Sequence, residues 1–299
     1  MRLYTVEKDG KRFICGGYTG DEGLWTMDCY GMNYECMLDL IKNATEADMA
    51  HLEKKPACPA PLTIEDVIIC APIPHPVGDV MCLGVNYYEH LVESSKAGHV
   101  GIDQAQKATV YFSKRVNEAV GCYGYIPSHT DICDSLDYEV ELGVIIGSDA
   151  KKVSGENALD YVFGYTIIND VSARNIQEKH KQWYFGKSLD GFCPMGPCIV
   201  TKAEFGDPSG HELRSFVNGQ PRQKSNTKLM MKDVPGLIEE LSAGTTLGAG
   251  TVIATGTPSG VGMGMDPKGY MQPGDVVECT IEGIGSLVNT VSRRVQERE

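Results

Sequence analysis

Short runs of apolar, β-branched residues alternate with polar turns along most of the chain. In an extended segment, side chains two residues apart share a face, so such runs predict strands. We predict strands over residues 140–146, 165–169, 198–201, 251–254 and 275–281.

Helical spacing of apolar residues appears between these strands. Each predicted helix follows a Ser or Asp, residue types that favour the N-cap. The predicted helices are residues 158–163 after Ser154, residues 173–182 after Ser172, and residues 234–242 between Asp233 and a stop at Gly244. Many short strands with few helices predict an α+β fold with a β-dominated core, rather than a doubly wound sheet.

The first seventy or so residues have a pattern of their own. A hairpin is predicted around Asp9 and Gly10, and "YECMLDLIKNA" has the spacing of a helix. Six prolines between Pro56 and Pro76 then indicate a connector. We therefore predict a small N-terminal domain over residues 1–74 and a larger domain over residues 75–299.

Composition narrows the range of partners. With 27 Lys and Arg against 40 Asp and Glu, the formal net charge is −13. Binding to nucleic acid or to an anionic membrane needs clustered cations, so neither partner is expected. No signal peptide or membrane-spanning run is apparent, and a cytoplasmic location is expected. Eleven scattered cysteines without a CxxC motif favour reduced thiols over a disulfide framework or a zinc site.

One predicted strand begins with an unusual run of acids. In "SLDYEVELGVIIG", Asp137, Glu139 and Glu141 alternate and should share one face. Burying like charges side by side is costly, so this face needs a cation, a shared proton or open water.

Asp170 offers a further carboxylate at the end of another apolar run, "YTIINDVSARNIQ". Together with Glu139 and Glu141 it would form an oxygen-donor set of the kind that suits Mg²⁺, Mn²⁺ or Ca²⁺. The alternative is that Asp170 is a turn residue and that the three acids line a solvated edge strand.

Other candidates for chemistry are weaker when taken singly. His90 and Glu93 share a helical face, and a His oriented by a carboxylate suits a general base, although a surface pair would look the same. Lys187 could stabilise an oxyanion or be a solvated lysine; Lys181 stands where a Walker loop requires glycine. The remaining polar candidates are Thr255, Gly256 and Thr257 in a tight turn, and Arg174, Gln177 and Lys181 on one helical face, with Arg174 as an ion-pair partner for Asp170.

Seven segments in order resemble the fumarylacetoacetate hydrolase family, over roughly residues 75 to 299. They are "LGVNYYEHLVES", "DYEVELGVIIG", "GYTIINDVSARNIQ", "GKSLDGFCPMGP", "VNGQPRQKSNTKLM", "IEELSAGTTLGAGTVIATGTPSGVG" and "PGDVVECTIEGIGSLVNTV". The resemblance implies the family's fold of mixed β-sheets or a β-roll with few helices, behind a small N-terminal α/β domain. It also implies a homodimer.

The resemblance further implies a Mg²⁺- or Mn²⁺-dependent enzyme that acts on a small anionic 2-oxo or β-diketo acid, with Ca²⁺ able to take the same place. It assigns the metal ligands to Glu139, Glu141 and Asp170, the water-activating dyad to His90 and Glu93, the oxyanion lysine to Lys187, and substrate contacts to Arg174, Gln177 and Thr257. Asp137 is less clearly a ligand and is expected to lie behind the metal ligands.

Hydrolysis of the C–C bond of an acylpyruvate is the reaction we expect, because the dyad favours water activation. Oxaloacetate-type decarboxylation, keto–enol or double-bond isomerisation, and dehydration of 2-oxo sugar acids use the same enolate and stay open. A protein that binds metal or ligand without catalysis is a remoter alternative. Gly98 and Gly101 are predicted hinges of a lid, and Arg115, which stands where many relatives have proline, could meet a second substrate carboxylate.

Overall fold

The computed structural model describes residues 1–96 and 108–293. Its largest element is an 11-stranded sheet that is antiparallel except where β16 meets β6. The strands in spatial order are β4 (Leu62–Thr63), β3 (Gly23–Thr26), β2 (Lys11–Gly17), β1 (Arg2–Lys8), β13 (Met195–Thr201), β11 (Val162–Asn169), β10 (Val140–Ile146), β16 (Val252–Ala254), β6 (Val80–Leu83) and β7 (Tyr111–Lys114), with β5 (Ile68–Ile69) paired to β1.

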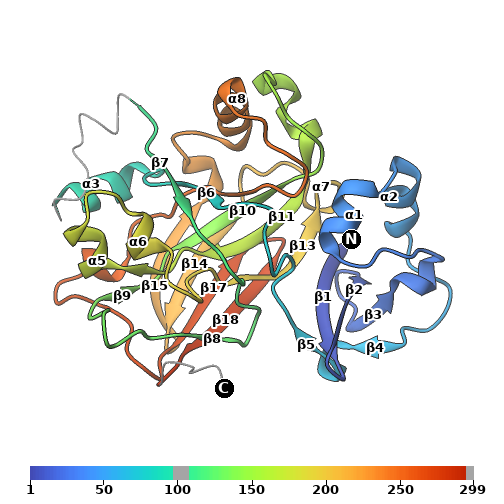
Figure 1. The fold of residues 1–299 in the computed structure, drawn as a ribbon, viewed down its shortest axis with the longest axis horizontal. Helices are drawn as coiled ribbons and strands as arrows, with labels where there is room; N and C mark the ends of the chain where they lie inside the picture. The colour runs from blue at the N-terminus through green and yellow to red at the C-terminus, as the bar shows by residue number, and fades with distance from the viewer. Residues whose placement is uncertain (97–107, 294–299) are drawn as a thin grey trace.

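A five-stranded sheet lies beside the large one (Figure 1). Its order is β15 (Gln220–Asn226), β14 (Glu212–Val217), β17 (Val276–Ile281), β18 (Gly285–Val291) and β8 (Tyr125–Ile126). A separate two-stranded sheet joins β12 (Ser172–Ala173) to β9 (Leu136–Asp137). The protein is thus an α+β protein with mixed sheets, as the sequence predicts.

Helices are short and lie around the sheets. The α-helices are α1 (Met37–Asn43), α2 (Glu46–Leu52), α3 (Tyr88–Lys96), α5 (Arg174–Lys179), α6 (Tyr184–Lys187), α7 (Lys202–Phe205) and α8 (Val234–Gly244), and the 3₁₀ turns are η1 (Met27–Tyr30), η2 (Ile64–Asp66), η3 (Gly155–Tyr161), η4 (Thr227–Leu229) and η5 (Gly262–Gly264). In Figure 1, α3, α5 and α6 lie on the side opposite the N-terminal strands. No helix among the described residues is long and apolar enough to cross a membrane.

Most predicted strands are confirmed with small changes at their ends. The strand over residues 140–146 is β10, while β11 and β13 each begin three residues earlier than predicted. The predicted hairpin joins β1 to β2. Asp9 and Gly10 at its turn have φ of 51° and 72°, the left-handed values that a two-residue turn of type I′ requires.

Two helix predictions need correction. Residues 155–161 form the 3₁₀ turn η3, and residues 162–163 already belong to β11, because pairing with β10 outweighs their helical spacing. Ser172 is not a cap: it lies in β12, and its hydroxyl donates to the carbonyl of Asp170. The helix that follows, α5, ends at Lys179.

The third helix prediction is confirmed. The side chain of Asp233 accepts a hydrogen bond from the Gly236 amide at 2.9 Å, as an N-cap should. Gly244 is the last helical residue rather than the residue after the helix.

The N-terminal strands are hydrogen-bonded into the large sheet. Arg2 and Leu3 of β1 pair with Val200 and Ile199 of β13. Their side chains also share a core with strands from later in the chain: Leu3 packs in one cluster with Ile145 and Ile199. The division near residue 74 stays a prediction, since the sheet continues across it.

Candidate active site

Strand pairing brings the three predicted metal carboxylates together. β10 and β11 run antiparallel with Val140 opposite Asn169, so Glu139 and Asp170 lie at the same end of the pair. The amide of Asp170 donates to the carbonyl of Glu139 at 2.9 Å. Glu141 points to the same side, and one carboxylate oxygen from each of the three residues lies within 4.8 Å of the others.

Three buried cations surround this triad. Lys187 Nζ donates to Glu139 Oε2 and to Asp170 Oδ2, each at 2.7 Å. Arg174 Nη2 donates to Glu139 Oε1 at 2.6 Å. Lys114 Nζ lies 2.8 Å from Asp170 Oδ1. Cations of the protein itself therefore balance part of the negative charge of the acidic run.

The cations do not reach every carboxylate. Glu141 Oε2 accepts the amide of Gly256 at 2.7 Å, a close approach allowed by a φ of +91° at that glycine. Glu141 Oε1 is buried and has no hydrogen-bond partner among the described residues. A buried carboxylate oxygen without a partner is costly, so this position calls for a proton or a bound cation.

Electrostatics separate the two glutamates of the triad. Burial raises the pKa of Glu139, but the attraction of Lys187 and Arg174 outweighs it and lowers the pKa to about 2. For Glu141, burial and then the charges of Asp170 and Glu139 raise the pKa well above its ordinary value. Burial lowers the pKa of Lys187, and the charges of Asp170 and Glu139 outweigh that effect and raise it.

The donor set fits a divalent cation. It consists of three buried carboxylates, which are the ligands that Mg²⁺, Mn²⁺ and Ca²⁺ prefer. Four buried acids in this region, Asp137, Glu139, Glu141 and Asp170, face three buried cations, Lys114, Arg174 and Lys187. If all are ionised, one negative charge remains in excess, and the unpartnered Glu141 Oε1 is where a cation would bind.

Helix α3 supplies the predicted dyad. His90 Nδ1 and Glu93 Oε2 are 2.9 Å apart, and His90 is only 2% exposed. Because Nδ1 faces the carboxylate, Nε2 is the nitrogen left for acid–base chemistry; Ser94 Oγ lies 3.4 Å from it. The structure therefore does not place this pair on the surface.

The predicted substrate-binding residues are also buried here. Arg174 Nη1 donates to Gln177 Oε1 at 3.0 Å, so the two side chains lie on one face of α5. Thr257 Oγ1 donates to the carbonyl of Val140 at 3.0 Å and accepts from Gln223 at 2.7 Å. The hydroxyl of Thr257 is thus already engaged within the protein.

Several predictions about individual residues need correction. Arg174 pairs with Asp137 and Glu139 rather than with Asp170. Lys181 lies beyond the end of α5 and does not share its face with Arg174.

Arg115 is exposed, and its Nη1 lies 4.0 Å from Asp79. The predicted hinges Gly98 and Gly101 lie outside the described residues.

Asp137 is joined to the triad through Arg174, which also pairs with Glu139. Its Oδ2 accepts from Arg174 Nε at 2.9 Å, and its two oxygens also accept the amides of Gly262 and Met263. Both oxygens are therefore fully used by the protein.

Sequence reasoning missed two buried residues at this site. Lys114 donates to the carbonyls of Val171 and Phe192 and is fully buried, although "YFSKR" reads as the polar end of a strand. Gln223 accepts from the amide of Val140 and donates to Thr257. A long polar side chain inside a strand pattern was the available signal in both cases.

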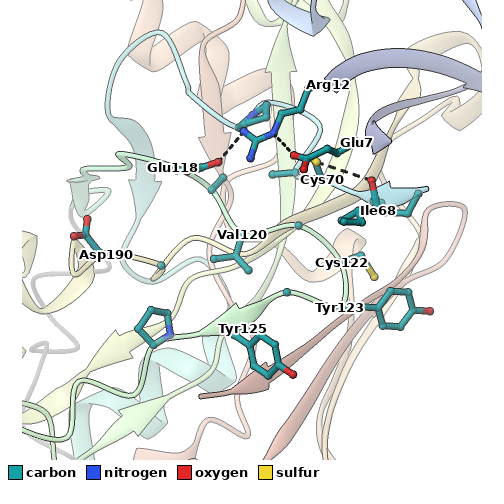
Figure 2. A pocket seen from close by; sticks show the side chains of 18 of the residues that line it. Glu7, Arg12, Ile68, Cys70, Glu118, Val120, Cys122, Tyr123, Tyr125 and Asp190 are labelled. Atoms are coloured by element: carbon teal, nitrogen blue, oxygen red, sulfur yellow. Dashed lines mark hydrogen bonds and ion pairs between the residues drawn. The ribbon is translucent and has the colours of Figure 1, made fainter. Parts of the chain in front are cut away.

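A separate hollow of 680 Å³ contains none of the predicted site residues. Figure 2 shows Arg12 in it, between Glu7 at 3.0 Å and Glu118 at 2.7 Å, with Tyr123 and Tyr125 at the opposite side. Arg12 thus pairs with both glutamates, while the Asp190 side chain accepts a hydrogen bond from the Asn117 side-chain amide at 2.8 Å. The predicted site residues therefore lie outside this hollow, at the triad and the dyad.

The fold and the site together define a class of β-rich proteins with a buried cluster of carboxylates. Comparison with known proteins identifies the family to which this class corresponds. Residues 79–292 match the family described as fumarylacetoacetate (FAA) hydrolase C-terminal. The chain therefore belongs to the fumarylacetoacetate hydrolase family. Members of this family are divalent-metal-dependent enzymes with varied activities.

Individual relatives illustrate this variety. The chain is 41% identical over 229 residues to the oxaloacetate tautomerase YisK of Bacillus subtilis. The aligned region covers 77% of this chain and 74% of that protein. It is similar to the structure of a fumarylacetoacetate hydrolase from Exiguobacterium antarcticum, with 41% identity, a TM-score of 0.85, and coverage of 98% and 100% of the two chains. A 5-carboxymethyl-2-hydroxymuconate delta-isomerase from Mycobacterium smegmatis is 32% identical, with a TM-score of 0.73 and coverage of 98% and 100%.

Proposed function

We propose that the protein is a divalent-metal-dependent enzyme that forms the enolate of a small 2-oxo or β-diketo acid. The observation that carries the proposal is the burial of the His90–Glu93 dyad in the same region as a carboxylate triad in which Glu141 Oε1 has neither a hydrogen bond nor an ion pair among the described residues. A positive charge on His90 would help to lower the pKa of Glu139, so the dyad lies close enough to the triad for the two to interact. A base beside a cation site is the arrangement that removal of a proton next to a ketone requires.

Glu139, Glu141 and Asp170 would hold Mg²⁺ or Mn²⁺, with Ca²⁺ able to take the same oxygen ligands. When bound, the metal supplies Lewis-acid stabilisation of negative charge on the substrate oxygens. His90 Nε2 takes the proton, while Glu93 holds Nδ1 and stabilises the imidazolium.

Arg174 and Lys187 supply positive charge for an anionic substrate. In the bonds described above, Lys187 uses two of its three N–H groups. Arg174 keeps one hydrogen on each terminal nitrogen. These remaining donors suit a substrate carboxylate or a developing oxyanion, with Gln177 beside them.

Keto–enol tautomerisation of an oxaloacetate-type acid is the first candidate reaction. It needs only proton removal at one atom and return at another, both within reach of a single base. The similarity to a protein named oxaloacetate tautomerase supports it.

Hydrolysis of an acylpyruvate is the second candidate. A buried histidine whose Nδ1 is fixed by a carboxylate can equally take a proton from water, and the resulting hydroxide would attack the carbonyl distal to the metal site. The C–C bond then breaks and releases the same kind of enolate. The similar structure of a fumarylacetoacetate hydrolase supports this reaction.

The test uses metal-stripped protein with oxaloacetate, acetylpyruvate and fumarylpyruvate, with and without Mg²⁺ or Mn²⁺. Decay of enol absorbance faster than the buffer rate, without carbon dioxide or a new acid, would identify a tautomerase. Release of pyruvate and a free acid would identify a hydrolase, and carbon dioxide a decarboxylase. The exposed His51 of α2 offers a matched control, since His51→Ala should retain the activity that His90→Ala loses.

Metal binding without turnover of any of these substrates would contradict both candidates and favour a sugar-acid dehydratase or a protein that only binds ligand. We also propose a homodimer that occupies the cytoplasm. Sedimentation of the purified protein at two concentrations tests the oligomeric state.

A further inference from the structure

A glycine-rich segment, residues 260–264 with the sequence "GVGMG", contacts Glu93 of the dyad on the side of its carboxylate that faces away from His90. The amide of Gly260 donates to Glu93 Oε1 at 3.0 Å, while Glu93 Oε2 faces His90 Nδ1 at 2.9 Å. The two oxygens of Glu93 therefore have separate partners. The Gly260 amide fixes the position of the carboxylate, and the carboxylate in turn orients the ring of His90.

The same segment is anchored to the acidic strand. The amides of Gly262 and Met263 donate to Asp137 at 2.7 and 3.0 Å, and Asp137 also accepts from Arg174. Asp137 is fully buried. Asp137 thus fixes the glycine segment, and the glycine segment in turn fixes the carboxylate of Glu93.

Gly264 lies against Glu93 more closely than any other residue type would permit. A Cβ at this position would lie 1.9 Å from Glu93 Oε1 and 2.3 Å from Glu93 Cδ. The backbone of Gly264 does not have a positive φ, so alanine is acceptable there except for this contact. The atoms that would have to move are the end of a flexible side chain, so the fold can tolerate a methyl group while the Glu93 carboxylate cannot stay in place.

We propose that the glycine segment positions Glu93, with Gly264 providing the space and the Gly260 amide fixing the carboxylate, so that His90 is held in one orientation. This inference rests on the proposed function only for the role of the dyad. The contact itself can be tested without substrate.

The decisive variant is Gly264→Ala. The methyl group should displace the Glu93 carboxylate, release His90 Nδ1 and lower kcat about a hundredfold, as loss of an outer partner of a catalytic group does. Mn²⁺ affinity should stay within about twofold, because the triad is not touched. Gly244→Ala is the matched control: nothing lies within 4 Å of its added Cβ, so kcat should not change.

A double-mutant cycle separates this positioning role from a general effect on structure. In a Glu93→Ala background the methyl group at position 264 has room, so Gly264→Ala should cause less than about a twofold further loss of kcat. Losses that multiply in the double variant would overturn the proposal.

NMR of the His90 ring provides a readout that needs no turnover. The ring signals, assigned by their loss in His90→Ala, should shift in Gly264→Ala and stay unchanged in Gly244→Ala. Unchanged His90 signals in Gly264→Ala would overturn the proposal. Absence of activity in the unmodified protein, with the expected NMR shift present, would contradict the proposed function but support the positioning role.

Discussion

The two ends of the acidic run 137–141 have similar side chains and opposite surroundings. At one end, Asp137 accepts two backbone amides of the glycine segment and the guanidinium of Arg174, so its charge is fully compensated. At the other end, Glu141 accepts one amide and keeps a buried oxygen without a partner. The difference indicates that the Asp137 end maintains structure, whereas the Glu141 end is prepared for a ligand.

Neutralising the ligand end should have the largest effect on activity. Gln at position 141 keeps the shape and an acceptor for the Gly256 amide, but removes the charge that a metal requires. We expect Glu141→Gln to cost at least about 4 kcal/mol of transition-state stabilisation, roughly a thousandfold in kcat. Steady-state kinetics and calorimetric titration with Mn²⁺ provide the measurement. Retention of tight Mn²⁺ binding would contradict the assignment of Glu141 as a ligand.

Removing the general base, His90, should have the next largest effect on activity. His90→Ala is expected to lower kcat by about a hundredfold or more, because a positioned general base contributes that amount. Mn²⁺ affinity should stay within about twofold, since His90 does not belong to the triad. A parallel loss of Mn²⁺ binding in the same titration would show that the dyad and the triad cannot be treated as separate parts.

Removing the carboxylate of Asp137 should mainly reduce the stability of the protein. Asp137→Ala leaves Arg174 with Glu139 as its only ionic partner, and it removes the acceptor of three backbone amides, those of Tyr138, Gly262 and Met263. We expect a loss of about 3–5 kcal/mol in the free energy of unfolding, measured by urea denaturation. Glu141→Gln is the comparison in the same assay and should cost less than about 1 kcal/mol. Equal losses would remove the distinction between the two ends.

Metal binding should change the free energy of unfolding by less than Asp137→Ala does. At a Mn²⁺ concentration one hundred times its dissociation constant, the apparent free energy of unfolding should rise by about 2.7 kcal/mol, because the ion binds the folded chain. Thermal or urea unfolding with and without Mn²⁺ gives the value. The Glu141→Gln variant should show no rise, and a full rise in that variant would place the metal elsewhere.

Local patterns predicted several elements of the fold, for reasons of backbone chemistry. The apolar run of β10, the Asp9-Gly10 turn and the Asp233 cap each depend on residues near one another in sequence. The pattern failed for residues 162–163, where pairing with β10 overrides helical spacing. Ser172 failed as a cap because the chain pairs with β9 before α5 begins.

The sequence by itself determined which groups are available: the acids of the 137–141 run, Asp170, and the HxxE pair on one helical face. Helical spacing correctly predicted the contact between His90 and Glu93. The acidic run, in contrast, does not lie in one strand, because Asp137 belongs to β9, Glu141 belongs to β10, and Glu139 belongs to neither. The identity of each partner was decided only by tertiary structure. Lys114 and Lys187 meet Asp170 from separate segments, and the glycine segment reaches Glu93 across 167 residues. Such contacts depend on how strands pair and loops return, and local spacing carries no information about them.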